Sequence, residues 1–179
     1  MNGTQVKSGR KHTAGDEVRE VLDSIRRIVR LLRLASREAE REVGLSGAQL
    51  FVLQKLAEAK MLSVNDLAER THTHQSSVSV VAQTLVDKGL IARSRAADDA
   101  RRLELTLTPQ AKALVRKSPG AAQGRLIEAV EGLPAVTRKQ LASSLAKLVE
   151  EAGLGDEEAP MVFEDGLGSK KSGRAKAAR

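Results

Sequence analysis

Apolar residues recur at helical spacing along most of this chain, and their pattern predicts the elements of the fold. From Asp16 to Val43 they form one wide stripe, which predicts a single helix of about 28 residues ending at Gly44. A second, buried helix is expected from Ser46 to about Ala59. Ser46 and Gln49 have the spacing of a capping box, which marks its start.

Residues 63–108 carry the most informative pattern. Ser63 and Asp66 have the spacing of a second capping box and open a short helix. A polar turn follows, and Thr73 is expected as the N-cap of a further helix over 74–88, which Gly89 ends. Two short helices joined by a tight turn predict a helix-turn-helix.

A β-hairpin is predicted directly after these helices. Leu103, Leu105 and Leu107 alternate with polar residues, as in a half-buried strand, and 90–95 reads as its partner. Residues 96–101 form the hairpin tip, and 61–62 is a candidate brief strand beside it. The class is therefore mainly α with a small β-hairpin wing: a winged helix-turn-helix plus a helical dimerisation region.

Further helices are expected after Thr108 and Pro109, a residue pair that suits a helix start. The first breaks at 118–120, and the last covers about 135–152. The helices predicted over 16–43, 109–130 and 135–152 carry apolar stripes. Together these stripes are more apolar surface than one small domain can cover, which favours a homodimer. The predicted organisation is a disordered basic tail over 1–15, a folded domain over 16–153 and a disordered tail over 154–179. Within the domain, 46–108 would read DNA, and 16–43 with 109–153 would pair the subunits.

The helix over 74–88 has the features needed to enter a DNA major groove. That groove admits one α-helix, whose first turns must carry small polar side chains and whose back must be apolar. Glutamine can pair with adenine, and serine can bond to any base or to phosphate. The residues expected to face outward are Thr73, His74, Gln75, Ser76, Ser77 and Ser79, and those expected to face inward are Val78, Val81 and Leu85.

The hairpin supplies the positive charge that this helix lacks. Arg93, Arg95, Arg101 and Arg102 fall on or beside one loop, and a guanidinium fits the narrow, electronegative minor groove. Asp98 or Asp99 is placed to pin Arg101 through a paired hydrogen bond. A helix in one groove and arginines in the next predict a double-stranded DNA interface.

Composition narrows the remaining classes. The basic tails 1–15 and 169–179 carry +3 and +5, so residues 16–168 sum to −1 and the net charge of +7 alone is weak evidence for DNA. The chain has no cysteine, no run long enough for a membrane span and no secretory pattern, so a cytoplasmic protein is expected. His72 and His74 lack accompanying ligands for a metal site, and no catalytic constellation is evident. We expect no enzyme, no metal and no cofactor.

The segment 63–110 resembles the core of the MarR family of transcriptional regulators, and the likeness extends over about 16–153. A polar turn at 72–75 and Ala111, where a glycine is common, depart from the pattern. The matching pieces are Leu67-Ala68, Ser77-Val78-Ser79, Leu85, Gly89-Leu90-Ile91, Arg93, the Asp99-x-Arg101 wing and Leu107-Thr108-Pro109.

The resemblance implies a homodimer on a pseudo-palindromic operator, usually acting as a repressor. It also implies release by a small, often aromatic, effector bound between the pairing helices and the reading segment. Two other functions remain open from the sequence: a winged-helix module that binds protein, and a protein that coats DNA without sequence preference.

Overall fold

The computed structural model describes residues 13–95, 103–118, 120–155 and 161. It divides into two compact units, 1–31 and 32–179. The long helix α1, Ala14–Val43, spans the boundary between them. Each unit is described by itself.

The first unit contains the start of α1, which begins earlier than predicted. Asp16 Oδ2 accepts hydrogen bonds from Thr13 N at 3.2 Å and Thr13 Oγ1 at 2.8 Å, and Asp16 N donates to Thr13 Oγ1 at 3.3 Å. The two bonds that the carboxylate accepts, first that from the Thr13 hydroxyl and then that from its backbone N–H, lower the pKa of Asp16. Ala14 and Gly15 are therefore helical, which corrects the assignment of 1–15 to a tail. The large apolar side chains exposed along this part of α1 are Val18, Val21, Leu22, Ile25 and Ile28.

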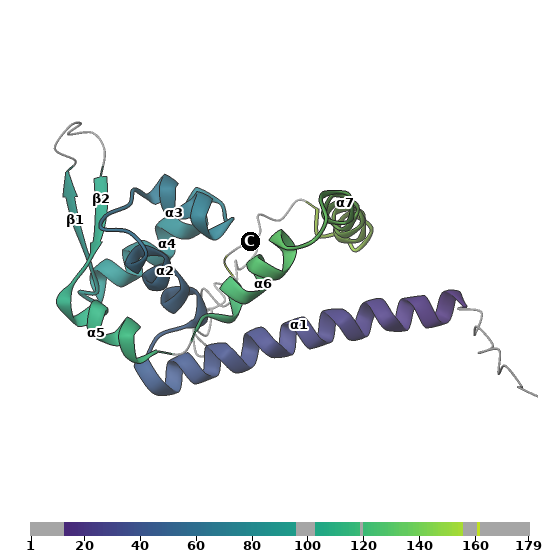
Figure 1. The fold of residues 1–179 in the computed structure, drawn as a ribbon, viewed down its shortest axis with the longest axis horizontal. Coiled ribbons are helices and arrows are strands. Elements are labelled where there is room, and N and C mark those ends of the chain that lie inside the picture. Colours follow the sequence, from purple (N-terminus) through teal and green to yellow (C-terminus); the bar gives the residue numbers. More distant parts are fainter. Residues whose placement is uncertain (1–12, 96–102, 119, 156–160, 162–179) are drawn as a thin grey trace, which may run out of the picture. The chain divides into compact units, whose positions relative to one another are not determined.

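The second unit holds the end of α1 and all other described elements, in the predicted order (Figure 1). The helices are α2 (Gly47–Ala57), α3 (Val64–Thr71), α4 (Gln75–Asp87), α5 (Pro109–Lys117), α6 (Ala122–Glu131) and α7 (Ala135–Glu151), and the strands are β1 (Ile91–Arg95) and β2 (Leu103–Leu107). Within the described part of the chain, no helix has the length and hydropathy to cross a bilayer.

The core of this unit is built around α2. Its capping box forms as predicted: Gln49 N donates to Ser46 Oγ at 3.3 Å, and Ser46 N donates to Gln49 Oε1 at 3.4 Å. Leu53 of α2 is fully buried, together with Leu67 of α3 and Leu85 of α4. The three helices are thus fixed to one another by aliphatic packing, in keeping with the scarcity of aromatic residues.

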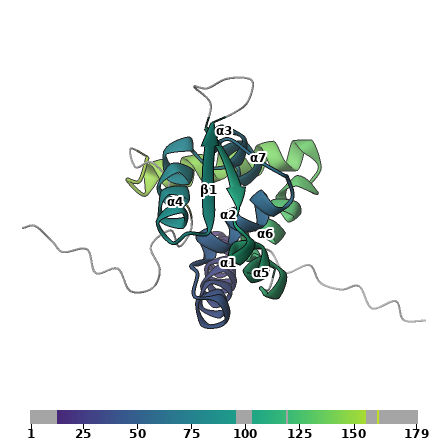
Figure 2. The ribbon, with the colours of Figure 1, turned by 90° about the vertical axis from the view of Figure 1, so that its left-hand side faces the viewer.

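The hairpin pairs β1 and β2 in antiparallel register, with Ile91 opposite Leu107 and Arg95 opposite Leu103. The predicted brief strand at 61–62 is confirmed as a bridge between Leu62 and Leu105. Figure 2 looks onto the hairpin and shows α4 beside β1. Because β1 contacts α4 and β2 contacts α2, the wing is anchored to the helix-turn-helix.

The segment after the hairpin begins as predicted, with Thr108 Oγ1 accepting from Ala111 N at 3.3 Å to cap α5. However, α5 contacts α2 and β2 and buries Ala111 completely, so it belongs to this core as well as to the proposed pairing helices. The predicted break at 118–120 is observed, and Gln54 spans it through bonds to Ser118 and Ala121.

Among the residues that the structure describes after α7, Met161 differs from its predicted form. In α7 no residue is buried, although its leucines and valines lie at helical spacing. Met161, which was assigned to a disordered tail over 154–179, is instead buried in the core of the second unit. Sequence pattern missed it because a single apolar contact has no period.

Candidate nucleic-acid interface

The turn between α3 and α4 is held by backbone and side-chain hydrogen bonds. Ser63 caps α3 in a complete capping box with Asp66, as predicted. At the other end, His72 adopts left-handed angles (φ 51, ψ 43), which lets the chain reverse, and Thr73 N donates to Ala68 O at 3.0 Å. Thr71 Oγ1 donates to Leu67 O at 2.7 Å. The angle between the helices is therefore fixed by the chain itself.

The start of α4 corrects two predictions. Its N-cap is His74, without a side-chain bond, whereas the Thr73 hydroxyl donates to Thr71 O at 3.0 Å. Ser77, expected to face outward, is only 7 % exposed. It lies one residue before Val78 and four before Val81, so it falls on the edge of the buried stripe and its small side chain fits against the core.

The inward face of α4 is otherwise as predicted, with Val78, Val81 and Leu85 buried. His74, Gln75, Ser76 and Ser79 are exposed, as expected. Two further residues share that outer face: Val80, which is 55 % exposed, and Gln83, whose Nε2 donates to Asp87 Oδ1 at 2.7 Å. Both were missed, although their four-residue spacing from Ser76 and Ser79 would have found them.

The wing presents positive charge on β1. Arg93 and Arg95 are exposed and lie opposite Leu105 and Leu103, respectively, in the ladder. They are two residues apart in one strand, where side chains alternate between the faces, so both leave β1 on the same face. The other predicted wing residues, Asp99, Arg101 and Arg102, lie outside the described residues.

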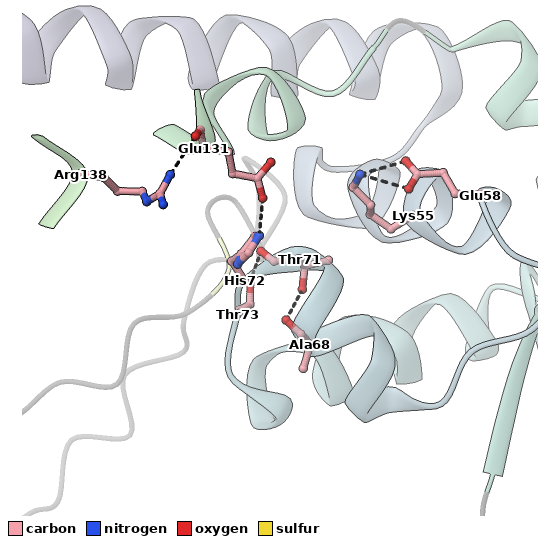
Figure 3. Close-up of polar contacts among 8 residues, drawn as sticks. All are labelled: Lys55, Glu58, Ala68, Thr71, His72, Thr73, Glu131 and Arg138. Carbon is pink, nitrogen blue, oxygen red and sulfur yellow. Dashed lines mark hydrogen bonds and ion pairs between the residues drawn. The ribbon is translucent and has the colours of Figure 1, made fainter. Parts of the chain in front are cut away.

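A polar contact links the turn to a distant part of the second unit (Figure 3). His72 Nε2 lies 3.1 Å from Glu131 Oε1 at the end of α6, and both side chains are 60 % exposed. Arg138 of α7 donates to Glu131 O at 2.8 Å. No local sequence pattern indicates this pairing, because the partners are far apart in the chain. Among the described residues, no group of three or more His, Cys, Asp and Glu side chains is gathered for a metal ion.

Comparison with known proteins identifies the domain that contains this surface. The MarR family model matches residues 43–102, a range that includes every residue proposed for the DNA interface. Residues 43–102 of this chain are therefore similar to the MarR family. This match overlaps the segment whose motifs, from Leu67 to Arg101, carry most of the resemblance.

One curated relative of this chain is the HTH-type transcriptional repressor MdtR of Bacillus subtilis. The two are 38% identical over 73 residues, which are 41% of this chain and 47% of the relative. The match thus spans about half the length of that protein.

Solved structures extend the likeness beyond residues 43–102 to most of the chain. A probable transcriptional regulator from Pseudomonas aeruginosa is 26% identical with a TM-score of 0.50, over 76% of this chain and 99% of that one. Sco3205, a MarR family transcriptional regulator from Streptomyces coelicolor solved in complex with DNA, has the same fold. It is 24% identical with a TM-score of 0.52, over 84% and 94% of the two chains.

Proposed function

We propose that this protein is a sequence-specific DNA-binding transcriptional regulator. The observation that carries the proposal is the division of α4 into two faces beside an arginine-bearing hairpin. One face packs Val78, Val81 and Leu85 into the core, and the other exposes small polar side chains. A helix of this kind can approach base edges closely without losing its support.

The outer face of α4 offers suitable chemistry for base edges. Gln75 and Gln83 carry amides that can pair with adenine, and the hydroxyl of Ser79 can bond to a base or to phosphate. Val80 adds methyl groups, which suit contact with the thymine methyl. Arg93 and Arg95 would lie along the backbone or in the neighbouring minor groove.

We further propose that the protein acts as a homodimer. The apolar side chains left exposed on α7 are those of a surface that packs on another helix: Val136, Leu141, Leu145, Leu148 and Val149. A two-fold axis would place two α4 helices about one DNA turn apart, on the two halves of a palindromic site.

Repression is the mode of action that we propose, because the curated relative of known role is a repressor. A small effector that releases the DNA is in keeping with the family resemblance. It would act where α6 meets the turn before α4, since the described contacts between these two parts include the His72–Glu131 pair.

A charge reversal tests DNA binding directly. Val80→Glu places a carboxylate on the exposed face of α4, where it would repel phosphate and base edges, so affinity for duplex DNA should fall by at least about 100-fold, or some 2.7 kcal/mol. Ala57→Glu is the matched control, because Ala57 is also exposed and apolar but lies on α2 beside α5. Fluorescence anisotropy with a labelled duplex pool measures both variants.

The outcomes separate three functions. A large loss for Val80→Glu alone supports DNA reading by α4. Equal affinity of the two variants for duplex DNA would contradict DNA reading by α4 and favour a module that binds protein. Strong binding with no preference among duplex sequences would favour a nonspecific DNA-coating protein, since a specific regulator prefers its site by about 10³-fold or more.

A further inference from the structure

A groove of ≈ 370 Å³ lies where the end of α2, the end of β2 and α5 meet. Leu107 and Val115 in its lining are buried and half-buried, whereas its three cationic side chains are exposed. The charges therefore lie around the mouth of the groove, and apolar surface lies deeper. The cations are Lys60, Lys112 and Arg116, and the apolar residues include Ala57, Leu107 and Val115.

The positive charge around this groove is not neutralised within the described part of the chain. None of the three cations forms an ion pair with an acid that the structure describes. Glu58, which is adjacent to Ala57 in the sequence, is paired with Lys55 at 2.9 Å. Lys112 and Arg116 are four residues apart on α5, so their charges repel each other. An anion bound between them would relieve this repulsion.

The spacing of the charges on α5 matches that of an extended peptide. A helical rise of 1.5 Å per residue places Lys112 and Arg116 about 6 Å apart along the helix axis. Alternate side chains of an extended strand leave the same face about 6.6 Å apart. A peptide lying along α5 could therefore direct acidic side chains to the two cations. Its intervening side chains would point the other way, towards α2 and the end of β2.

We propose that this groove binds an acidic segment of a partner protein, in extended form, with Asp or Glu at alternate positions and apolar residues between them. The carboxylates pair with Lys112 and Arg116, and the apolar side chains cover Ala57 and Leu107. Both halves of this chemistry are needed, because the groove combines unpaired charge with exposed apolar surface. Duplex DNA supplies phosphates but no apolar side chains, so it fits the groove less well.

The groove is separated from the helix proposed to read DNA. Helix α4 contacts β1, whereas α5 contacts β2. Figure 2 shows α4 and α5 on opposite sides of β1. The groove therefore stays open to a partner protein while α4 faces DNA. This inference goes beyond the proposed function and does not depend on it.

Synthetic peptides test the proposed ligand chemistry on the full chain. A fluorescent peptide of sequence Asp-Leu-Asp-Leu-Asp should bind in an anisotropy titration. Asn-Leu-Asn-Leu-Asn, which has no charge, and Asp-Ser-Asp-Ser-Asp, which has no apolar side chain, should each bind at least about tenfold more weakly. Absence of binding by the first peptide, or equal binding of either control peptide, would overturn the proposal.

A pair of double variants tests the place of binding. Lys112→Gln with Arg116→Gln removes both charges from α5 and should weaken the acidic peptide by about tenfold. Arg33→Gln with Arg37→Gln is the matched control, because these arginines are also exposed and four residues apart, but lie on α1. This control should bind within about twofold of wild type. Circular dichroism verifies folding, and equal affinities of the two folded variants would overturn the proposal.

Two single variants separate the groove from the DNA interface. Ala57→Glu places a carboxylate in the groove and should weaken the acidic peptide by at least about tenfold, whereas Val80→Glu should not. Equal peptide affinities would overturn the proposal. Displacement of the peptide from Val80→Glu by excess duplex DNA would assign the groove to phosphate and would also overturn it. Peptide affinity is measured without DNA, so its failure is distinguishable from a failure of the proposed function.

Discussion

The same substitution at two serines should separate folding from DNA contact. In α3, Ser63 lies in a capping box: its Oγ accepts from Asp66 N at 3.2 Å and donates to Asp66 Oδ2 at 2.8 Å. In α4, Ser79 is exposed on the outer face. Changing either one to alanine removes a single hydroxyl, so any difference in outcome comes from position.

The expected energies differ in sign. Ser63→Ala leaves the first turn of α3 without its cap and should lower the free energy of unfolding by about 1 kcal/mol. Ser79→Ala should leave stability unchanged or raise it by up to ~0.5 kcal/mol, because alanine is the better helix former. For DNA affinity the order reverses. Loss of a hydrogen bond to a charged phosphate at Ser79 is worth about 1.5 kcal/mol or more, which is at least tenfold.

Urea unfolding and fluorescence anisotropy at one protein concentration measure the two quantities. Ser63→Ala should be less stable but bind duplex DNA within about threefold of wild type, because a loss of ~1 kcal/mol leaves the protein folded. Ser79→Ala should be stable but bind weakly. If Ser63→Ala costs no more stability than Ser79→Ala, the role of the cap is refuted; if Ser79→Ala binds normally, its place in the interface is refuted.

Three further predictions concern the wing, a turn and the core. The double change Arg93→Ala with Arg95→Ala should reduce the slope of log affinity against log salt by about 2, and an unchanged slope would place both arginines off the DNA. Gly89→Ala forces a side chain onto a backbone with φ +67 and should lower the free energy of unfolding, measured in urea, by about 1–2 kcal/mol. Gly120, which has no positive φ, is the control: Gly120→Ala should change the free energy of unfolding by no more than about 0.5 kcal/mol, and equal losses in the two variants would contradict the backbone argument. Leu85→Ala, at a fully buried position, should cost about 2–5 kcal/mol, and a loss below 1 kcal/mol would show that α4 does not depend on this packing.

Periodicity and capping chemistry predicted most of the fold because they are local signals. The boxes at Ser46 and Ser63 and the cap at Thr108 mark helix starts that the structure confirms. The alternation over 103–107 likewise gave β2 its correct bounds. In each case, residues within one or two turns of each other determine the structure, so the sequence alone contains the information.

The candidate site was predicted less completely, because its details depend on packing. Ser77 was predicted to face outward as a polar residue, yet it lies at the edge of the buried stripe of α4, beside Val78 and Val81, and is only 7 % exposed. The Thr73 hydroxyl donates a hydrogen bond to Thr71 O instead of capping α4. Contacts between distant segments, such as His72 with Glu131 and Met161 with the core, leave no periodic trace and required the structure.

Selection of bound sites from random duplexes tests the central claim most directly. If two α4 helices read DNA around a two-fold axis, the recovered sites should share an inverted repeat whose half-site centres lie about 10–10.5 base pairs, or one turn, apart. Recovery of a single unrepeated motif, or of no enriched sequence at all, would contradict the account.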